Sequence, residues 1–219
     1  MVLFRNRSLL TKITVVVTVI LLVFFAVATY IDYRLHRQFI IAESVEKARI
    51  IAAEAIRARE YLSDQLQIGD VQLSQERYGL IPVVASTRIG ELVAQDLDYR
   101  IRQVSDRYRN PKNAPDAFEI ESLRKFYADP NLKELYAVSR IEGTQVFRYL
   151  QPFRAEQSCL ECHGDPRQAP DFIKRLFPEE KDQAYHYRIG EIRGAASVTI
   201  PMSQLQKAIY ANVRNDLFY

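Results

Sequence analysis

The residues with the clearest chemistry are the cysteines and the histidine of the segment Cys159-Leu160-Glu161-Cys162-His163. This C-x-x-C-H order is the haem-attachment sequence of c-type cytochromes. The two thiols add to the vinyl groups at one edge of the macrocycle, and the histidine that follows directly reaches the iron. The chain has 2 cysteines, which is too few for a disulfide scaffold. The motif therefore predicts one covalently attached haem c, with His163 as the metal ligand.

Three other interpretations of these residues remain open at this point. A C-x-x-C pair can form a redox disulfide, but such pairs normally open a helix after a strand in a βαβ unit, and no such unit is evident here. A zinc site needs further ligands, and the remaining histidines, His36 and His186, do not form a pair. The third interpretation is a pair of simple buried thiols. Haem attachment agrees best with the full five-residue pattern.

Composition and charge exclude several classes of protein. The chain has 219 residues, of which 48% are hydrophobic and 26% charged, so neither a disordered nor a low-complexity protein is credible. The formal net charge of +3, from 30 basic and 27 acidic residues, gives no electrostatic footprint for nucleic acid. No acid–base pair, nucleophile–base set or phosphate loop accompanies the haem motif, so an enzyme is not expected.

An uncharged stretch near the N-terminus runs from Ile13 to Ile31. At about 1.5 Å per residue, about 20 helical residues cross the roughly 30 Å hydrocarbon layer of a bilayer. The segment Ala26-Val27-Ala28 fits a signal-peptidase site, but the apolar run is longer than the usual core of a signal peptide. We therefore predict an uncleaved transmembrane signal-anchor over residues 13–32.

The haem motif sets the expected topology. Haem c is attached on the outer face of energy-transducing membranes, so the residues after the anchor are expected on the periplasmic side of the cell inner membrane. The predicted division is a cytoplasmic N-terminus over residues 1–12, the anchor over 13–32, and an extracytoplasmic haem domain over 33–219. The expected partners are the membrane, through one span, and either a second copy of the chain or partner membrane subunits.

The soluble part has the pattern of an α+β fold with an antiparallel sheet. From Tyr33 to about Leu66 the chain lacks glycine and proline, which predicts a long amphipathic helix that continues the membrane helix. We expect its apolar stripe to pack on the core rather than to form a dimer seam. The stripe consists of Phe39, Ala42, Val45, Ala48, Ala52, Ala55, Ala58 or Arg59, and Leu62.

Shorter elements follow this helix. Capping residues predict helices that begin at Ser86 or Thr87, at Asp116 with a D-x-x-E box, and at Ser203. The sequence Glu142-Gly143-Thr144 predicts the turn of a hairpin. The strands expected from their patterns are 99–108, 135–141, 145–150 and 192–200, and the last helix is expected to extend through Leu205, Ile209, Val213 and Leu217.

Several motifs in a fixed order carry a family resemblance. They are Arg107-Tyr108-Arg109-Asn110-Pro111-Lys112-Asn113-Ala114-Pro115-Asp116 with Glu119, then Cys159 to His163 followed by Gly164-Asp165-Pro166, then Ala169-Pro170, and then Gly190 to Val198. Together they resemble the Tll0287-like haem domain family, also called DUF3365, over nearly all of residues 40–205. The resemblance implies a PAS-like antiparallel sheet flanked by helices, one covalently held haem, and frequent use as the extracytoplasmic sensor of membrane histidine kinases and chemoreceptors.

Other residues are expected near the haem. Arg107 and Arg109 are candidates to bind its propionates by charge-assisted hydrogen bonds, although a structural role for their segment is favoured. The resemblance includes members whose iron takes a distant cysteine opposite the histidine, a ligand that is excluded here if both thiols form thioethers. The remaining candidates for the sixth ligand are His186, Met202, a tyrosine such as Tyr78, or no protein ligand, and His36 is disfavoured.

Two functions follow from these expectations. The first is a membrane-anchored module in which the redox state of the haem, or a bound diatomic gas, changes packing between the haem pocket and the helices that enter the membrane. The alternative is an electron-transfer cytochrome subunit of a larger membrane complex. An open coordination position favours gas sensing, whereas histidine or methionine as the sixth ligand favours electron transfer.

Overall fold

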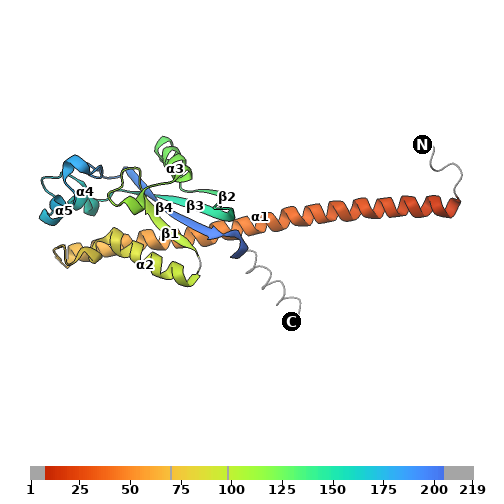
Figure 1. The fold of residues 1–219 in the computed structure, drawn as a ribbon, viewed down its shortest axis with the longest axis horizontal. Helices are drawn as coiled ribbons and strands as arrows, with labels where there is room; N and C mark the ends of the chain where they lie inside the picture. The colour runs from red at the N-terminus through yellow and green to blue at the C-terminus, as the bar shows by residue number, and fades with distance from the viewer. Residues whose placement is uncertain (1–7, 70, 98, 205–219) are drawn as a thin grey trace. The chain divides into compact units, whose positions relative to one another are not determined.

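The computed structural model describes residues 8–69, 71–97 and 99–204. The chain divides into two compact units, Met1–Glu43 and Ser44–Tyr219. Helix α1, Leu9–Ile68, is a single helix of 60 residues, which confirms the expected continuation past the apolar stretch (Figure 1). By length and composition α1 is able to cross a membrane, with a hydropathy of 2.6 over its most apolar window and none of that window buried.

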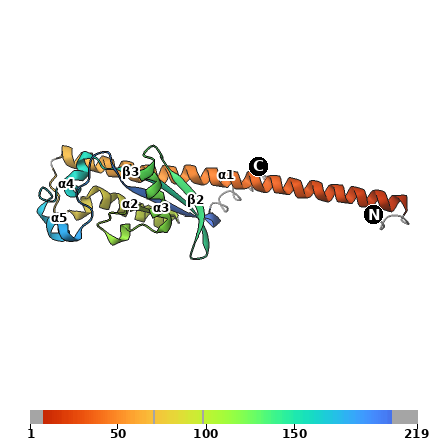
Figure 2. The ribbon, with the colours of Figure 1, turned by 90° about the horizontal axis from the view of Figure 1, so that it is seen from above.

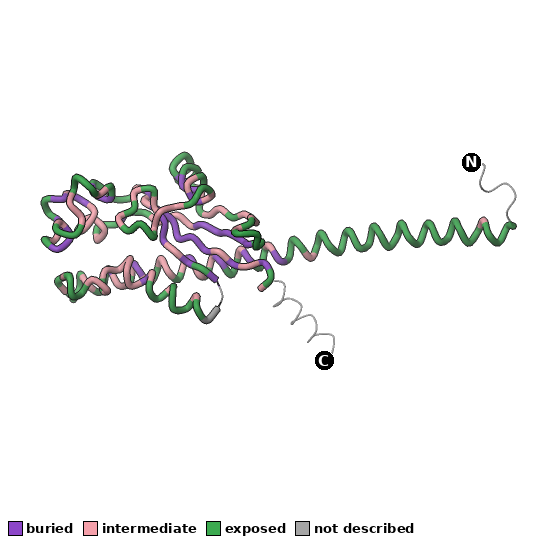
Figure 3. Tube along the Cα trace, viewed as in Figure 1, coloured by how far each residue is buried: buried purple, intermediate pink, exposed green. Residues whose placement is uncertain are grey.

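The second unit is built on one antiparallel sheet of four strands (Figure 1). Its order is β1-β4-β3-β2, and all three pairings are antiparallel. This confirms the predicted α+β class. The sheet is the buried centre of the unit (Figure 3). The strands are β1 Arg100–Val104, β2 Leu135–Ile141, β3 Thr144–Arg154 and β4 Ile192–Pro201.

The hairpin of β2 and β3 extends to the edge of this unit (Figure 2). Its turn residues Glu142 and Gly143 have positive φ angles of 49° and 80°. Two successive residues with positive φ match the right-handed twist of the strands, and glycine takes this conformation without steric cost. Thr144, expected in the turn, instead begins β3 and pairs with Ile141.

Helix α3, Ala117–Ala128, covers one face of the sheet. Asp116 caps it and Glu119 completes the capping box, as predicted. Its apolar residues join Val104, Leu150 and Ala195 in one core cluster.

The opposite face of the sheet lies toward α1 and α2. Successive strand residues point to opposite faces, so Gln103 of β1 points away from the face on which its neighbour Val104 joins the core cluster. On this opposite face Gln103 contacts Arg59 of α1 and Ser86 of α2. The two helices therefore form the second layer of this unit.

Helix α2, Pro82–Leu97, begins earlier than predicted. The expected cap at Ser86 or Thr87 is wrong, because both hydroxyls lie inside the helix and bond to the carbonyl of Val83. Pro82 stands at the first position, where its fixed φ suits a helix and its missing N–H would be unpaired in any case.

The buried face of α1 within the second unit differs from the predicted apolar stripe. Ala48 and Ala52 are fully buried as expected, and of the alternatives Ala58 and Arg59 it is Arg59 that is buried, but the face also contains Ser44 and Ser63. Small and polar side chains lie here because part of this face borders a cavity that also has polar walls. The stripe predicted from hydrophobicity alone was therefore wrong in omitting Ser44 and Ser63.

The remaining elements are short. The helix predicted to start at Ser203 has only its first residues in the described part of the chain, and its continuation through Leu217 lies outside it. The other short helices are η1 Tyr78–Leu80, η2 Pro111–Asn113, η3 Gln157–Cys159, α4 Leu160–His163, α5 Asp171–Leu176 and η4 Glu179–Lys181.

Candidate haem site

The C-x-x-C-H motif forms a compact helical segment. Cys159 ends the short helix η3, and Cys162 and His163 belong to the single turn of α4. Both cysteines are free thiols and are half-buried. Gly164 ends the turn, and a Cβ at this position would lie only 2.5 Å from the carbonyl oxygen of Leu160. A glycine after the histidine is therefore required by the close approach of the backbone.

The ring of His163 is held in one orientation. Its Nδ1 donates to the carbonyl oxygen of Ala184 at 2.7 Å, because a carbonyl can only accept. The ring also stacks on Tyr187, with centroids 4.9 Å apart and an interplanar angle of 9°. A proton fixed on Nδ1 leaves Nε2 as the nitrogen available to a metal.

Burial lowers the pKa of His163 to about 4, and the nearby charge of Arg109 acts in the same direction. The imidazole is therefore neutral at pH 7, which is the form that binds metals. Burial also raises the pKa of the Cys162 thiol to about 11. Cys162 is therefore a neutral thiol in this environment rather than a reactive thiolate.

Arg109 binds both the motif and the segment beside it. Its Nε donates to Oδ2 of Asp182 at 2.6 Å, and its Nη2 donates to the backbone oxygen of Cys162 at 2.9 Å. The guanidinium carbon also lies over the rings of Phe177 and Tyr185, at 4.9 Å and 4.8 Å from their centroids. The side chain thus connects the motif to the segment 182–187.

Arg107 binds the same segment. Its Nε donates to the backbone oxygen of Gln183 at 2.6 Å, and its Nη2 donates to that of Tyr185. Its guanidinium also lies over the ring of Tyr187, 5.2 Å from the centroid. Because this segment supplies both the carbonyl and the ring that orient His163, the two arginines position the histidine indirectly. Propionate binding by Arg107 and Arg109 remains a prediction.

A cavity of about 1070 Å³ opens in front of the motif. Such a volume is at the upper end of the range for small-molecule sites, which is appropriate for a macrocycle. All five sequence-predicted site residues, Cys159, Cys162, His163, Arg107 and Arg109, line it. The two thiols and the available nitrogen of the histidine therefore border one space, which is the donor set that haem c needs.

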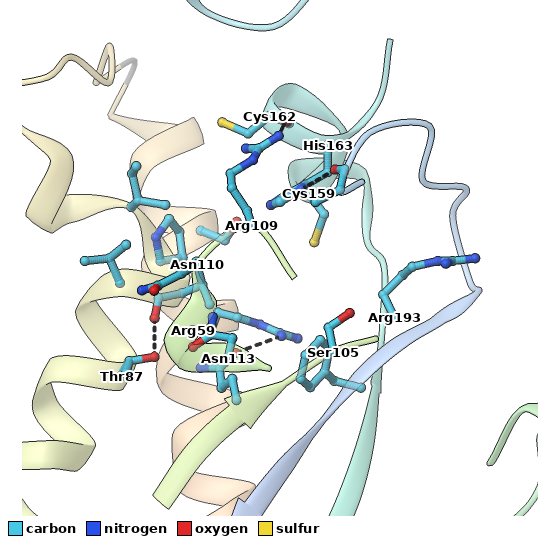
Figure 4. Close-up of a pocket in the computed structure, with 18 of the residues that line it drawn as sticks. Arg59, Thr87, Ser105, Arg109, Asn110, Asn113, Cys159, Cys162, His163 and Arg193 are labelled. Carbon is cyan, nitrogen blue, oxygen red and sulfur yellow. Dashed lines mark hydrogen bonds between the residues drawn. The ribbon is translucent and has the colours of Figure 1, made fainter. Parts of the chain in front are cut away.

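Figure 4 shows the two sides of this cavity. Cys159, Cys162 and His163 lie on one side, and Arg59, Asn113 and Thr87 lie on the other. The second side comes from α1, α2 and the segment after β1. The cavity lining also includes apolar residues that suit the faces of a porphyrin, namely Leu66, Val71, Ile81 and Val84.

The candidates for the sixth ligand are not all brought to the cavity. Tyr78 lines it, whereas His186, Met202 and His36 are not among its lining residues. The side chain of His186 is exposed, and its Nε2 lies 3.1 Å from Oε1 of Glu179. Met202 is buried just beyond the end of β4.

Arg59 is the site residue that the sequence analysis failed to identify as such. It is 8% exposed, and its Nη1 donates to Oε1 of Gln103 over a long 3.4 Å. Its guanidinium carbon lies 4.3 Å from the centroid of the Phe153 ring. The only signal in the sequence is a charged residue at a position where the helical stripe calls for an apolar one.

Comparisons with known proteins identify similar chains. The family model described as Tll0287-like matches residues 36–201. The crystal structure of the cyanobacterial heme-protein Tll0287 is similar, with a TM-score of 0.60 and 26% sequence identity, and the match covers 73% of this chain and 95% of that chain. No curated protein sequence matches this chain.

Proposed function

This chain belongs to the Tll0287-like family, and on that premise we propose that it carries one haem c. Cys159 and Cys162 form the thioethers, and Nε2 of His163 binds the iron. The observation that carries the proposal is the orientation of His163, whose Nδ1 is bonded to Ala184 while its ring borders the same cavity as both thiols. When bound, the haem supplies an iron that can change its redox state or bind a diatomic gas.

The residues of this chain supply orientation and an enclosed site. Arg107 and Arg109 hold the segment that carries Ala184, and this keeps the proton on Nδ1 and Nε2 free for the iron. We retain both arginines as cofactor-binding residues in the proposal. Binding of the haem propionates by these two arginines would be a second role, independent of how they position His163.

We propose that the apolar part of α1 is a single membrane anchor over residues 13–32. Residues 1–12 are then cytoplasmic, and the haem domain over 33–219 is on the periplasmic side of the inner membrane. The uncharged stretch supports the anchor, and the C-x-x-C-H motif supports the outer location. The expected partners are the membrane and either a second copy or membrane subunits.

The cavity favours a sensing role for redox state or a diatomic gas. Its lining, within the described residues, contains no histidine other than His163 and no methionine. The walls therefore supply neither histidine nor methionine as a sixth ligand, and Tyr78 is the one predicted candidate among the described lining residues. We propose that Tyr78 does not bind the iron, so that a coordination position stays available for an exogenous ligand. The helix α1 carries both cavity residues and the apolar segment, so a haem-dependent change at Arg59 or Ser63 acts on the helix that enters the membrane.

The test of haem attachment uses the full chain, produced with a c-type haem maturation system and purified in detergent. After acid-acetone extraction, the denatured polypeptide is expected to retain its haem, with the pyridine haemochrome spectrum of a macrocycle that has lost both vinyl groups. In the double variant Cys159→Ala, Cys162→Ala the haem is expected to move into the acetone. Extraction of haem from the unmodified chain would refute the proposal.

The test of sensing against electron transfer uses the same holoprotein. The spectrum of the reduced protein is expected to change rapidly on addition of CO or NO, as for an iron with an open position. An unreactive six-coordinate spectrum would instead favour the alternative, an electron-transfer subunit.

A further inference from the structure

The cavity contains a buried cation with no ion-pair partner. Arg59 is 8% exposed, yet none of the ion pairs within the described part of the chain includes it. Its only hydrogen bond to another described residue is the 3.4 Å contact with Gln103. The face of the Phe153 ring, 4.3 Å away, offers a weaker cation–π contact. A buried guanidinium normally has closer and better-charged partners than these.

Buried neighbouring side chains fix the position of this guanidinium. Gln103 and Ser86 are both buried, and Nε2 of Gln103 donates to Oγ of Ser86 at 2.6 Å. This bond turns the Oε1 of Gln103 toward Arg59. The Nε and Nη2 groups of Arg59 have no hydrogen-bond acceptor among the residues that the structure describes, although they belong to a residue that lines the cavity.

The electrostatic surroundings compensate the charge of Arg59 only in part. Burial lowers the pKa of Arg59, and this outweighs the opposing effects of Cys159, Glu156 and Glu60. Thioether formation would remove the ability of Cys159 to become negative. Burial and the neighbouring Glu60 raise the pKa of Glu156, and neither carboxylate forms an ion pair with Arg59 among the described residues. An anion from outside the protein would supply the missing partner.

We infer that Arg59 is the anion-binding residue of this cavity and that it binds a small inorganic anion held at the haem, on the side away from His163. The inference rests on the proposed function and names the ligand class of the same site. Figure 4 places Arg59 across the cavity from His163. The charged fork of an arginine donates charge-assisted hydrogen bonds to anions, which are stronger than those between neutral groups.

A haem propionate is the other source of negative charge, and the location of Arg59 disfavours it. The guanidinium of Arg59 lies 4.3 Å from the ring centroid of Phe153, at the end of the strand that leads into Cys159. The cysteines bind the vinyl substituents, which lie on the half of the macrocycle away from the two propionates. A guanidinium near the attachment edge is therefore better placed for a ligand over the haem than for a propionate.

The experiment measures azide affinity of the ferric holoprotein by visible absorption titration, because azide is an anion at neutral pH. Arg59→Gln is expected to raise the azide Kd by about tenfold or more, whereas Arg59→Lys keeps the charge and is expected to retain much of the affinity. Arg124→Gln is the control, because the side chain of Arg124 is 73% exposed and does not line the cavity. It removes the same charge and is expected to leave the azide Kd unchanged.

CO affinity of the ferrous protein provides the second readout, since CO is neutral. The Arg59→Gln variant is expected to change CO affinity far less than azide affinity, and an equal loss of both would indicate a collapsed pocket and overturn the inference. If Arg59→Gln does not accumulate with haem, Gln103→Leu removes the acceptor that holds the guanidinium. The azide Kd must then change without a matching change for CO.

Three results would refute the inference while leaving the proposed function intact. They are covalent haem with no azide binding in the unmodified protein, covalent haem with equal azide affinity in the Arg59→Gln variant, and a redox potential that shifts in this variant without any change in azide affinity. The last result would assign Arg59 to a propionate. Absence of covalent haem from the unmodified chain is a different outcome, which refutes the proposed function itself.

Discussion

Two buried arginines of this domain have opposite surroundings. Arg148 of β3, which is 5% exposed, lies 2.7 Å from Oδ2 of Asp116 and 3.2 Å from Oε1 of Glu119. Arg59 of α1 is buried to a similar degree but has no carboxylate partner within the described residues. A buried charge is costly unless the protein compensates it. The comparison indicates that the first arginine serves the fold and the second serves a ligand.

The ion-pair site of Arg148, Asp116 and Glu119 includes further groups that donate hydrogen bonds to Glu119. Glu119 accepts from Nη2 of Arg102 at 2.6 Å, from Oγ of Ser197 at 2.7 Å and from the backbone N–H of Asp116 at 2.9 Å. These bonds connect the capping box of α3 to strands β1 and β4. Such a network fixes how the helix docks on the sheet, because Glu119 bonds to both strands at once, although the Nε of Arg148 has no hydrogen-bond partner within the described part of the chain.

The largest expected effect is the loss of the carboxylate that organises the paired site. Glu119→Ala leaves the buried charge of Arg148 with Asp116 as its one carboxylate partner among the residues that the structure describes and removes the partner of the partly exposed Arg102, so the free energy of unfolding should fall by about 3–5 kcal/mol. Denaturant unfolding of the full chain in detergent measures it. The control Glu121→Ala removes an exposed carboxylate from the same helix and should change stability by less than about 0.5 kcal/mol. Equal effects of the two substitutions would show that Glu119 contributes no more to stability than an exposed carboxylate, and Arg148 would then not differ from Arg59 in this respect.

The next effect concerns an arginine that belongs to the haem site and is nevertheless paired. Arg109→Met leaves Asp182, whose side chain is 3% exposed, without its ion-pair partner, and should destabilise the protein by about 3 kcal/mol. It also frees the segment that orients His163, so the visible spectrum of the haem should change. In the control Arg167→Met, an exposed ion pair with Asp165 is lost and neither property should change. An unaltered spectrum in the Arg109 variant would contradict the positioning role.

The pH dependence of stability tests how much the ion pair of Arg148 with Asp116 contributes to folding. Burial alone would raise the pKa of Asp116, but its hydrogen bonds with Arg148 and with the backbone of Glu119 hold this pKa below its usual value. The unfolded chain therefore binds the proton more tightly, and the stabilisation is present above about pH 3.9, the ordinary value for Asp. It is lost as pH falls through the lower pKa of the folded state.

The variant Asp116→Asn tests this sign. Unfolding measured at several pH values should show a deficit of about 1 kcal/mol near neutral pH, and this deficit should shrink as pH falls below about 3.9. A deficit that stays constant down to the lowest pH would mean that the carboxylate charge of Asp116 does not contribute.

The parts of this structure that depend on local chemistry were predictable from the sequence. The capping box of Asp116 and Glu119, and the turn at Glu142 and Gly143, depend on residues close together in the chain. The haem motif is equally local. The start of α2 was missed because this helix was predicted from the capping residues Ser86 and Thr87, although Pro82 stands earlier and proline is favoured at the first position of a helix.

The parts that depend on distant residues were not predictable. Arg107 and Arg109 bind the segment 182–187, and no spacing rule connects an arginine to a backbone oxygen so far along the chain. Helical periodicity places Arg59 on the inner face of α1 but cannot indicate whether that face meets apolar core or a cavity. Tertiary packing decides which of these surrounds it.

The smallest expected effect on stability is the most informative for the comparison. Arg59→Met replaces a buried charge that has no carboxylate partner by an apolar side chain of similar length, and the chain should lose little or gain about 1 kcal/mol in its free energy of unfolding. Arg148→Met is the matched variant, because it makes the same substitution where the charge is paired and leaves Glu119 buried. If Arg59→Met destabilised the protein as strongly as Arg148→Met, the guanidinium of Arg59 would be part of the structural framework, and its distinction from Arg148 would be lost.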